Sequence, residues 1–209
     1  ATASPSILNN VIRDNHVTDG YSGGSFSGVG AGIYIDVAST TDTPQPVIRD
    51  NTITNNSGDN AYGIGIGIGN MVSYGGDQGR ALPTIDSNTI TGNTSIADSR
   101  VDGTAIWIEY GGTATQDVVI ENNTITGNGT QGETTSEYGT VYLTDTYATV
   151  QNNDILNNYA GKAAGIQVVG GSVVTITGNT ISGNTAEGDE TGGIYADSST
   201  VTVDSNVIG

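Results

Sequence analysis

A nine-residue pattern recurs along the whole chain and constrains its fold more than any other feature. The copy that starts at Ile48 reads Ile-Arg-Asp-Asn-Thr-Ile-Thr-Asn-Asn, with aliphatic residues at positions one and six and Asn at positions four and nine. Copies start at Ile7, Ile48, Ile85, Ile120, Val150, Ile176 and, truncated, Val203. Successive starts are 41, 37, 35, 30, 26 and 27 residues apart. A short unit repeated at drifting intervals indicates a solenoid with loops of variable length.

The aliphatic positions predict two short strands per repeat. Residues around them alternate with a period of two, which is typical of strands and not of helices. We therefore expect two inward-facing columns of side chains. The first column is Ile7, Ile48, Ile85, Ile120, Val150, Ile176 and Val203, and the second is Ile12, Ile53, Ile90, Ile125, Ile155, Ile181 and Ile208.

The Asn at the fourth position predicts a ladder of stacked amides. Its copies are Asn10, Asn51, Asn88, Asn123, Asn153, Asn179 and Asn206. Asn tolerates left-handed backbone, so we expect this residue itself to bend the first strand into the second. Amides stacked at the strand spacing of about 4.8 Å can hydrogen-bond along the axis. A second column follows at Asn15, Asn56, Asn93, Asn128, Asn158 and Asn184.

A third strand is expected upstream of each frame, after a variable loop. Its copies are the four-residue stretches that begin at Gly32, Gly63, Ala105, Thr140, Gly165 and Gly193. Three short parallel strands per coil with an Asn bend resemble the right-handed parallel β-helix superfamily, which includes pectate-lyase-like and NosD-like proteins. The resemblance implies an all-β, single-stranded right-handed parallel β-helix of about six turns with Asn ladders. Residues 1–209 are expected to form one such domain, either complete or a piece of a longer chain.

The composition of the chain excludes some binding partners and suggests a cellular location. The chain has 22 Asp and Glu against five Lys and Arg, a net charge of −17. This acidity argues against nucleic acid and anionic membrane surfaces as partners. No apolar run is long enough to predict a membrane-spanning segment. Gly, Asn, Thr and Ser are abundant and Lys is scarce, a composition like that of secreted β-solenoids, so we expect a secreted, extracellular or cell-surface protein.

The outward face of the third strands is the first candidate site. Alternate residues there include Tyr34, Asp36, Trp107, Glu109, Tyr142 and Tyr195, with Gly65 and Gly67 in the second coil. In β-helix enzymes that act on carbohydrates the glycan lies on this strand face, and the resemblance implies the same placement here. Aromatic rings stack on sugars while carboxylates accept from hydroxyls. The competing interpretation is that Tyr and Trp favour strands in any case.

Catalysis on this face is the alternative to simple binding. Asp36 and Glu109 are expected two coils apart with Gly65 between them, near the upper end of the separation that inverting glycosidases use. Lyases and epimerases of this fold rely on Lys, Arg, His or Tyr beside acidic groups, but no Lys, Arg or His falls on this face. We therefore carry over no catalytic residue. A polysaccharide lyase, glycoside hydrolase or epimerase, or its binding fragment, remains the rival to a non-enzymatic structural or adhesive module.

Two further surface patterns suggest lesser alternatives. Outward Thr pairs in the second strands, such as Thr52 with Thr54, resemble the Thr-x-Thr faces of ice-binding solenoids, with a break at Asp154 and Leu156. Acidic residues after the last second strands, Glu187, Asp189 and Glu190, raise the possibility of calcium as a cofactor. No EF-hand or glycine-aspartate repeat accompanies them, so a solvated acidic face is the preferred interpretation and no metal site is assigned.

The terminal repeats predict self-association. They carry the same inward aliphatic columns as the middle ones, and no helical pattern that would cap either end is visible. Open coil ends expose strand edges that pair readily with other strands. Head-to-tail stacking of copies would give an open filament. The alternative is that loop 16–31 covers the first coil and the chain stays monomeric.

Overall fold

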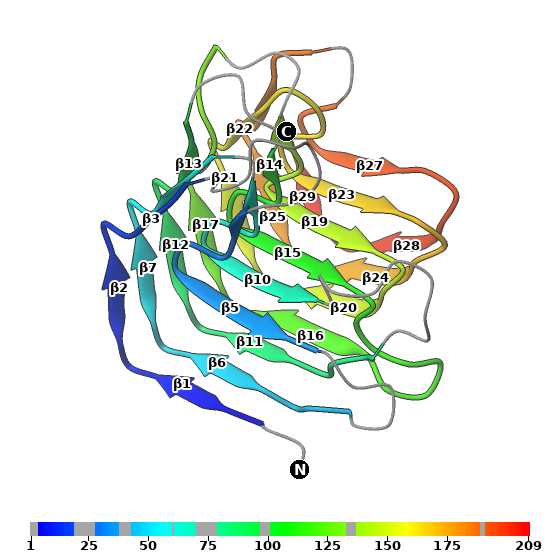
Figure 1. Cartoon of the computed structure of the whole chain (residues 1–209). Helices are drawn as coiled ribbons and strands as arrows, with labels where there is room; N and C mark the ends of the chain where they lie inside the picture. Colours follow the sequence, from blue (N-terminus) through cyan, green and yellow to red (C-terminus); the bar gives the residue numbers. More distant parts are fainter. Residues whose placement is uncertain are drawn as a thin grey trace, which may run out of the picture.

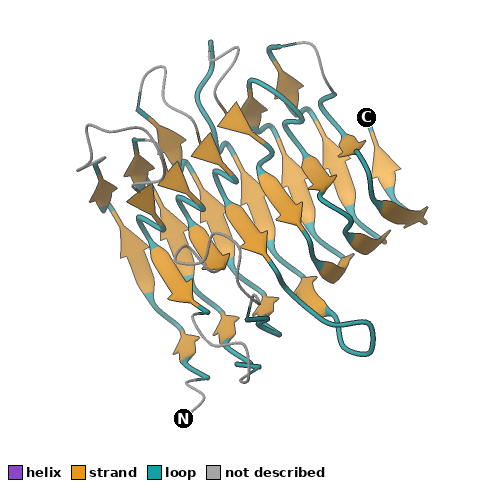
Figure 2. Ribbon diagram, turned by 45° about the vertical axis from the view of Figure 1, so that its right-hand side comes forward, coloured by secondary structure: helices purple, strands orange, loops and turns teal. Residues whose placement is uncertain are grey.

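The chain winds into stacked coils, and the strands of each coil run parallel to those of the next (Figure 1). The computed structural model describes residues 4–18, 28–37, 43–59, 61–69, 79–96, 101–132, 137–188 and 191–209. Strands and loops make up the whole described part, and the coils follow one another from the N-terminal to the C-terminal end of the stack (Figure 2). No helix long and apolar enough to cross a membrane occurs among these residues.

Three long sheets run the length of the stack. The first-strand sheet contains β1 (Ser6–Leu8), β6 (Val47–Arg49), β11 (Thr84–Asp86), β16 (Val118–Glu121), β20 (Tyr147–Gln151), β24 (Val173–Thr177) and β28 (Thr200–Asp204). The second-strand sheet contains β2 (Val11–Arg13), β7 (Thr52–Thr54), β12 (Thr89–Thr91), β17 (Thr124–Thr126), β21 (Asp154–Leu156), β25 (Thr180–Ser182) and β29 (Val207–Ile208). The third-strand sheet contains β5 (Ile33–Asp36), β10 (Ile66–Gly69), β15 (Ile106–Glu109), β19 (Val141–Thr144), β23 (Ile166–Val169) and β27 (Ile194–Ala196).

Three smaller sheets extend the coils between the second and third strands. A three-stranded sheet contains β3 (His16–Val17), β8 (Ser57–Gly58) and β13 (Thr94–Ser95). A four-stranded sheet contains β4 (Gly28–Val29), β9 (Ala61–Tyr62), β14 (Val101–Asp102) and β18 (Glu137–Tyr138), and a two-stranded sheet contains β22 (Tyr159–Ala160) and β26 (Thr185–Ala186). We expected only loops here. The described ends of loop 16–31 form β3 and β4, and its remainder lies outside the described residues.

Both predicted Asn ladders are confirmed. In the first ladder, each Nδ2 donates to the Oδ1 of the Asn in the next coil at 2.9–3.1 Å, from Asn10 to Asn206. The backbone N–H of each donating Asn bonds the same Oδ1. The second ladder runs from Asn15 to Asn184 at 2.9–3.0 Å. The interior amides are buried, so these bonds satisfy polar groups that would otherwise destabilise the core.

The bend itself is made by a different residue than expected. Left-handed backbone falls on the residue before each ladder Asn, as in Asp50 before Asn51 with φ 56° and Ser87 before Asn88 with φ 56°. The second ladder follows the same rule, with Gly127 before Asn128 at φ 62°. The preceding residue makes the turn, and the ladder Asn then turns its amide inward. Our assignment of the bend to the ladder Asn was wrong by one position.

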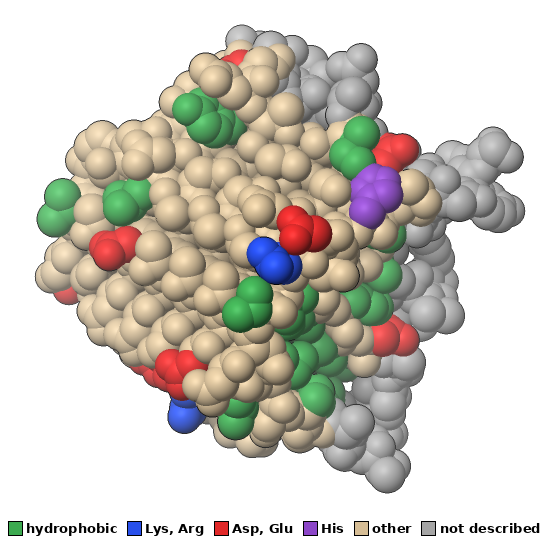
Figure 3. Space-filling view, turned by 90° about the vertical axis from the view of Figure 1, so that its left-hand side faces the viewer, with side chains coloured by type: hydrophobic (Ala, Val, Ile, Leu, Met, Phe, Trp, Pro, Cys, Tyr) green, Lys and Arg blue, Asp and Glu red, His purple; other side chains and the backbone are tan. Residues whose placement is uncertain are grey.

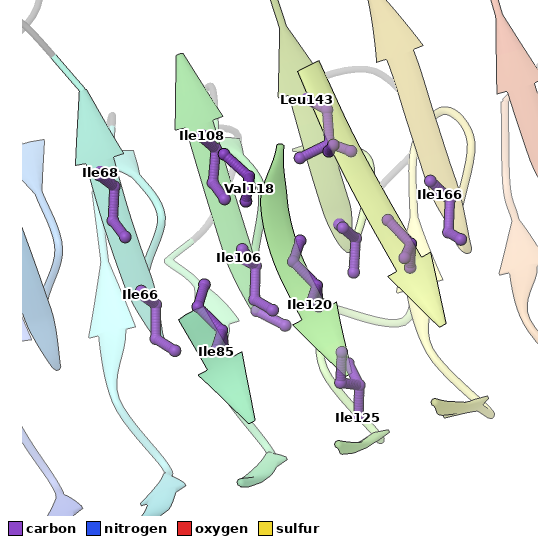
Figure 4. Close-up of a cluster of buried hydrophobic side chains, with 14 of the residues drawn as sticks. Ile66, Ile68, Ile85, Ile106, Ile108, Val118, Ile120, Ile125, Leu143 and Ile166 are labelled. Carbon is purple, nitrogen blue, oxygen red and sulfur yellow. The ribbon is translucent and has the colours of Figure 1, made fainter. Parts of the chain in front are cut away.

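The core is a column of aliphatic side chains between the long sheets. The two predicted inward columns are buried in the middle coils, as Ile85, Ile120 and Ile125 illustrate (Figure 4). Third-strand residues such as Ile66 and Ile106 point into the same core from the opposite wall (Figure 4). At the ends burial is incomplete: Ile7 and Ile12 are partly buried, and Val203 and Ile208 are exposed. Every interior coil is therefore stabilised by apolar contacts to both neighbours.

Candidate functional site

The third-strand sheet presents two outward rows of side chains. One row follows the register Tyr34, Gly67, Trp107, Tyr142, Gln167 and Tyr195. The other pairs Asp36 with Gly69 and Glu109 with Thr144. We had placed Gly65 and Gly67 in these rows, but the second coil is shifted by two residues, so Gly67 and Gly69 occupy them. Asp36 and Glu109 therefore flank Gly69, not Gly65.

Trp107 is not on an open surface. Its side chain is 2% exposed, and its ring centroid lies 5.1 Å from that of Tyr62 at an interplanar angle of 47°. Gly69 makes room for the indole, because a Cβ at that position would lie 2.6 Å from two ring carbons. The expectation of an exposed Trp107 that stacks on sugars is therefore wrong, and in this structure the indole is a packing residue.

The cover over Trp107 comes from the four-stranded sheet. Gly63 and Gly103 follow its strands β9 and β14 in left-handed conformation, with φ 63° and 72°. Any side chain at Gly63 would collide with the backbone of Ile66 and Gly67, so the chain doubles back tightly onto the third-strand sheet. Tyr62 and Asp102, which pair in register just before these glycines, are thereby buried beside the outward rows.

The remaining predicted residues are more accessible. Tyr34, Tyr142 and Tyr195 are half-buried, Glu109 is half-buried, and Asp36 is exposed. The Tyr34 hydroxyl donates to the carbonyl of Gly69 at 3.3 Å, which ties the ring to the neighbouring strand. The sheet thus aligns the six candidate residues in two rows, but it leaves only three aromatic rings near solvent.

Glu109 is electrostatically unusual. Burial raises the pKa of its carboxyl from 4.5 to about 7, and the negative charges of Asp145 and Asp102 add to the shift. Within the described residues the Glu109 carboxylate makes no hydrogen bond and no ion pair. A carboxyl group with a pKa close to neutrality can hold or release a proton near physiological pH.

Arg80 lies beside this carboxylate cluster but is bound to the backbone. One guanidinium nitrogen, Nη1, donates to the carbonyls of Gly111, Gly112 and Asp145 at 3.1, 3.1 and 3.0 Å. The guanidinium carbon also lies 5.5 Å from the centroid of the Tyr147 ring. Nearby, the pKa of Tyr110 is raised by burial and by the charges of Glu109 and Asp145, against the opposing effect of Arg80. Arg80 therefore links successive coils and does not neutralise Glu109.

Sequence reasoning missed Tyr62, Asp102 and Asp145. Tyr62 and Asp102 have a recognisable signal, since each directly precedes a glycine shortly upstream of a third strand, as Val29 and Tyr138 do. Aligning these glycines would have shown a further strand that returns over the sheet. Asp145 carries no such signal, because its influence on Glu109 depends on the turn that follows β19.

The Thr array of the second-strand sheet is aligned as expected. Thr52, Thr89 and Thr124 are register partners, and the second residue of each outward pair forms a parallel column. The array is broken in the next coil by Asp154 and Leu156. On this side of the molecule, charged and hydrophobic side chains are scattered among other side chains and backbone (Figure 3). Ice binding by this face stays a prediction.

The calcium hypothesis gains no support from a ligand cluster. Glu187 is half-buried, and Asp189 and Glu190 lie outside the described residues. In the part of the chain that the structure describes, no group of three or more His, Cys, Asp or Glu is placed to hold a metal ion.

Fold and site together define a class of protein: a parallel β-helix whose third-strand face carries tyrosines and carboxylates. Residues 68–209 match the family described as a right handed beta helix region, and the chain belongs to that family. This confirms the predicted right-handed parallel β-helix. Comparison with curated proteins and with solved structures gives no significant match.

Proposed function

We propose that this protein is a secreted or cell-surface β-helix module that binds glycans and acts by contact, without chemical turnover. The observation that carries the proposal is the row of half-buried tyrosines, Tyr34, Tyr142 and Tyr195, in register on one sheet. A tyrosine ring offers an apolar face and a polar edge, as a sugar ring does. The adjacent carboxylates of Asp36 and Glu109 can accept from sugar hydroxyls.

Calorimetric titration with neutral and charged oligosaccharides tests this proposal. Tyr142→Ala should weaken binding about tenfold or more, because an aromatic anchor contributes strongly to binding. Tyr159→Ala, in the two-stranded sheet, is the matched control and should bind as the wild type does. Absence of binding across the panel, or equal losses in both variants, would contradict the proposal.

An extracellular location is supported by composition. The net charge of −17 keeps such a protein soluble and repels anionic partners such as nucleic acid. Fractionation of the source cells should place the protein in the medium or on the surface. Recovery with the intracellular fraction would contradict this part of the proposal.

A carbohydrate-active enzyme is the second candidate, and the state of Glu109 favours it. A carboxyl with a pKa of about 7 suits a general acid, and Asp36 stands two strands away across Gly69. That corresponds to about 9–10 Å between the strands, near the upper limit of the roughly 6.5–9.5 Å between carboxylates in inverting glycosidases. Release of reducing ends that Glu109→Gln abolishes and Asp154→Asn spares would support it, and a panel without any cleavage would oppose it.

We also propose that copies of this chain stack end to end. The inward residues Ile7 and Ile12 of the first coil are only partly buried, and Val203 and Ile208 of the last coil are exposed. Within the described residues, no donor reaches the Oδ1 of Asn10, and no acceptor faces the backbone N–H of Asn206. The same edges would accept either a further coil or the first coil of a second copy.

A further inference from the structure

Among the described residues, no cation pairs with the carboxylates of Glu109 and Asp36 on the third-strand face. Glu109 is half-buried, and the charged groups that shift its pKa are both negative, Asp145 and Asp102. Asp102 is 2% exposed, so its charge acts through a poorly screened surrounding. Asp36 adds a further carboxylate to the same outward row. Such a surface attracts positive charge and repels negative charge.

The cations that the structure describes are engaged elsewhere. Arg80 donates to three backbone carbonyls, and the Lys162 ammonium lies 5.0 Å from the centroid of the Tyr138 ring. Arg49 pairs with Asp86 at 3.1 Å, and Arg13 with Asp14 at 3.6 Å, and both arginines belong to other sheets. None of these four side chains forms an ion pair with Glu109 or Asp36.

A second, independent feature of the face is a buried acceptor without a donor. Gln167 follows Tyr142 and precedes Tyr195 in the aromatic row, and its side chain is 4% exposed. Among the described residues, its Oε1 has no hydrogen-bond partner. A buried polar atom without a partner is rare in native proteins and is costly, so it marks a place where a donor is missing. The face therefore lacks donors at two separate positions.

We infer that the glycan bound here carries protonated amino groups. An ammonium is a compact positive charge with three hydrogen-bond donors and no acceptor. One ammonium at Glu109 would neutralise the carboxylate, and a donor reaching Gln167 would satisfy its free oxygen. The rings of Tyr34, Tyr142 and Tyr195 can pack against the sugar rings and attract the cations. Uronate chains would meet repulsion. This inference rests on the glycan-binding function proposed above.

The test compares three hexasaccharides that differ in charge. A glucosamine hexamer should bind about tenfold or more tightly than its N-acetylated counterpart at a pH where its amines are protonated, because an ammonium beside Glu109 also favours the ionised form of the carboxyl. A galacturonate hexamer should bind most weakly. Glu109→Gln should remove most of the preference for the amine, because binding of the amine hexamer should fall far more than binding of the N-acetylated hexamer. Asp154→Asn makes the same charge change on the second-strand sheet and should preserve the preference.

The other possible outcomes distinguish failure of this inference from failure of the proposed function. Equal affinities for the amine and N-acetyl hexamers, both weakened by Tyr142→Ala, would overturn the inference and leave the proposed function standing. A galacturonate preference would do the same. Equal effects of the Glu109 and Asp154 variants would reduce the amine preference to general charge attraction and also overturn it. If no hexasaccharide binds, both the inference and the proposed function fail.

Discussion

At the scale of single residues, the fold depends on two adjacent residues that have different roles in each turn. One residue adopts left-handed backbone, and the next, the ladder Asn, sends its amide inward. The left-handed position holds Asn, Asp, Ser or Gly, and Gly, Asn and Asp are the residue types that tolerate this conformation best. The ladder position is Asn throughout, because only its amide combines the donors and the acceptor that successive coils require.

Replacement of a ladder residue should be costly. Asn123→Leu removes the Oδ1 that accepts from both the backbone N–H and the Nδ2 of Asn88, and the donors to Ile85 and Asn153. We expect a loss of roughly 1–3 kcal/mol in the free energy of unfolding, at the upper end of that range since several groups lose partners. Urea unfolding followed by circular dichroism measures it. The exposed neighbour Thr124→Ala should cost less than about 0.5 kcal/mol, and equal effects would contradict the ladder's role.

The raised pKa of Glu109 predicts that the stability of the protein depends on pH. Its pKa is raised in the folded protein from 4.5 to about 7 by burial, then by Asp145 and Asp102. Between these values the folded state holds more protons than the unfolded state, so the free energy of unfolding falls as pH rises through this window. Glu109→Gln removes that titration. The variant should match the wild type near pH 4.5 and exceed it near pH 8, by on the order of 1 kcal/mol after solvent screening.

The measurement is the urea midpoint of both proteins across this pH range. Other carboxylates titrate in both proteins, so the difference between the two curves isolates Glu109. A constant difference at all pH values would show that the carboxyl of Glu109 has an ordinary pKa in the folded protein.

What the sequence could reveal at this scale follows from which interactions repeat from coil to coil. The ladder and the inward columns repeat in register, so they were predicted correctly for Asn10 to Asn206. The state of Glu109 also depends on Asp102 and Asp145. The glycine after Asp102 signals its strand, but the approach of Asp145 is set by the turn that follows β19, and no spacing along the chain encodes it.

At the scale of elements, the third-strand sheet is only partly a binding face. The alternation that predicted an outward Trp107 is correct, since Trp107 does lie on the outer side of β15. Its burial comes from the four-stranded sheet, which returns at Gly63 and Gly103 and lays Tyr62 over the indole. Alternation within one strand reports which side a residue takes, but it cannot report whether a second layer covers that side.

The register predicted for the glycine-rich second coil was wrong for a related reason. The stretch from Gly63 to Gly69 alternates Gly and Ile without interruption, so a shift by two residues keeps every Ile inward. Register is weakly specified by such a pattern. In the structure the room that Trp107 needs beside Gly69 and the tight turn at Gly63 fix the pairing.

Burial of Trp107 predicts its fluorescence. As the single Trp of the chain, it should emit at short wavelength in the folded protein and resist quenching by iodide. Unfolding in urea should shift the emission to longer wavelength and make it quenchable. Tyr62→Ala opens the cover and should restore part of the quenching without unfolding the coil. A folded protein with strongly quenchable emission would contradict the burial described here.

At the scale of the whole molecule, each coil is stabilised mainly by its two neighbours. The middle coils bury their inward columns completely, while Val203 and Ile208 of the last coil are 48% and 52% exposed. The sequence predicted exposed apolar side chains at the ends of the stack, since the terminal repeats carry the same aliphatic columns as the middle repeats. An apolar column that ends in water, beside open strand edges, favours association with another coil.

End-to-end stacking of this chain can therefore be tested by placing a charge in the column. In the wild type we expect concentration-dependent assembly by sedimentation velocity and rods by electron microscopy, because a head-to-tail contact does not close. Ile208→Lys puts an ammonium where the next coil would pack and should give a monomer. Val173→Lys is the matched control: Val173 is also exposed, at 42%, but it lies on the side of the stack in β24. Assembly should survive that change.

A wild-type chain that stays monomeric at every concentration would refute stacking. Loss of assembly in both variants would show that the added charge prevents assembly wherever it is placed, and not that the coil end is the contact.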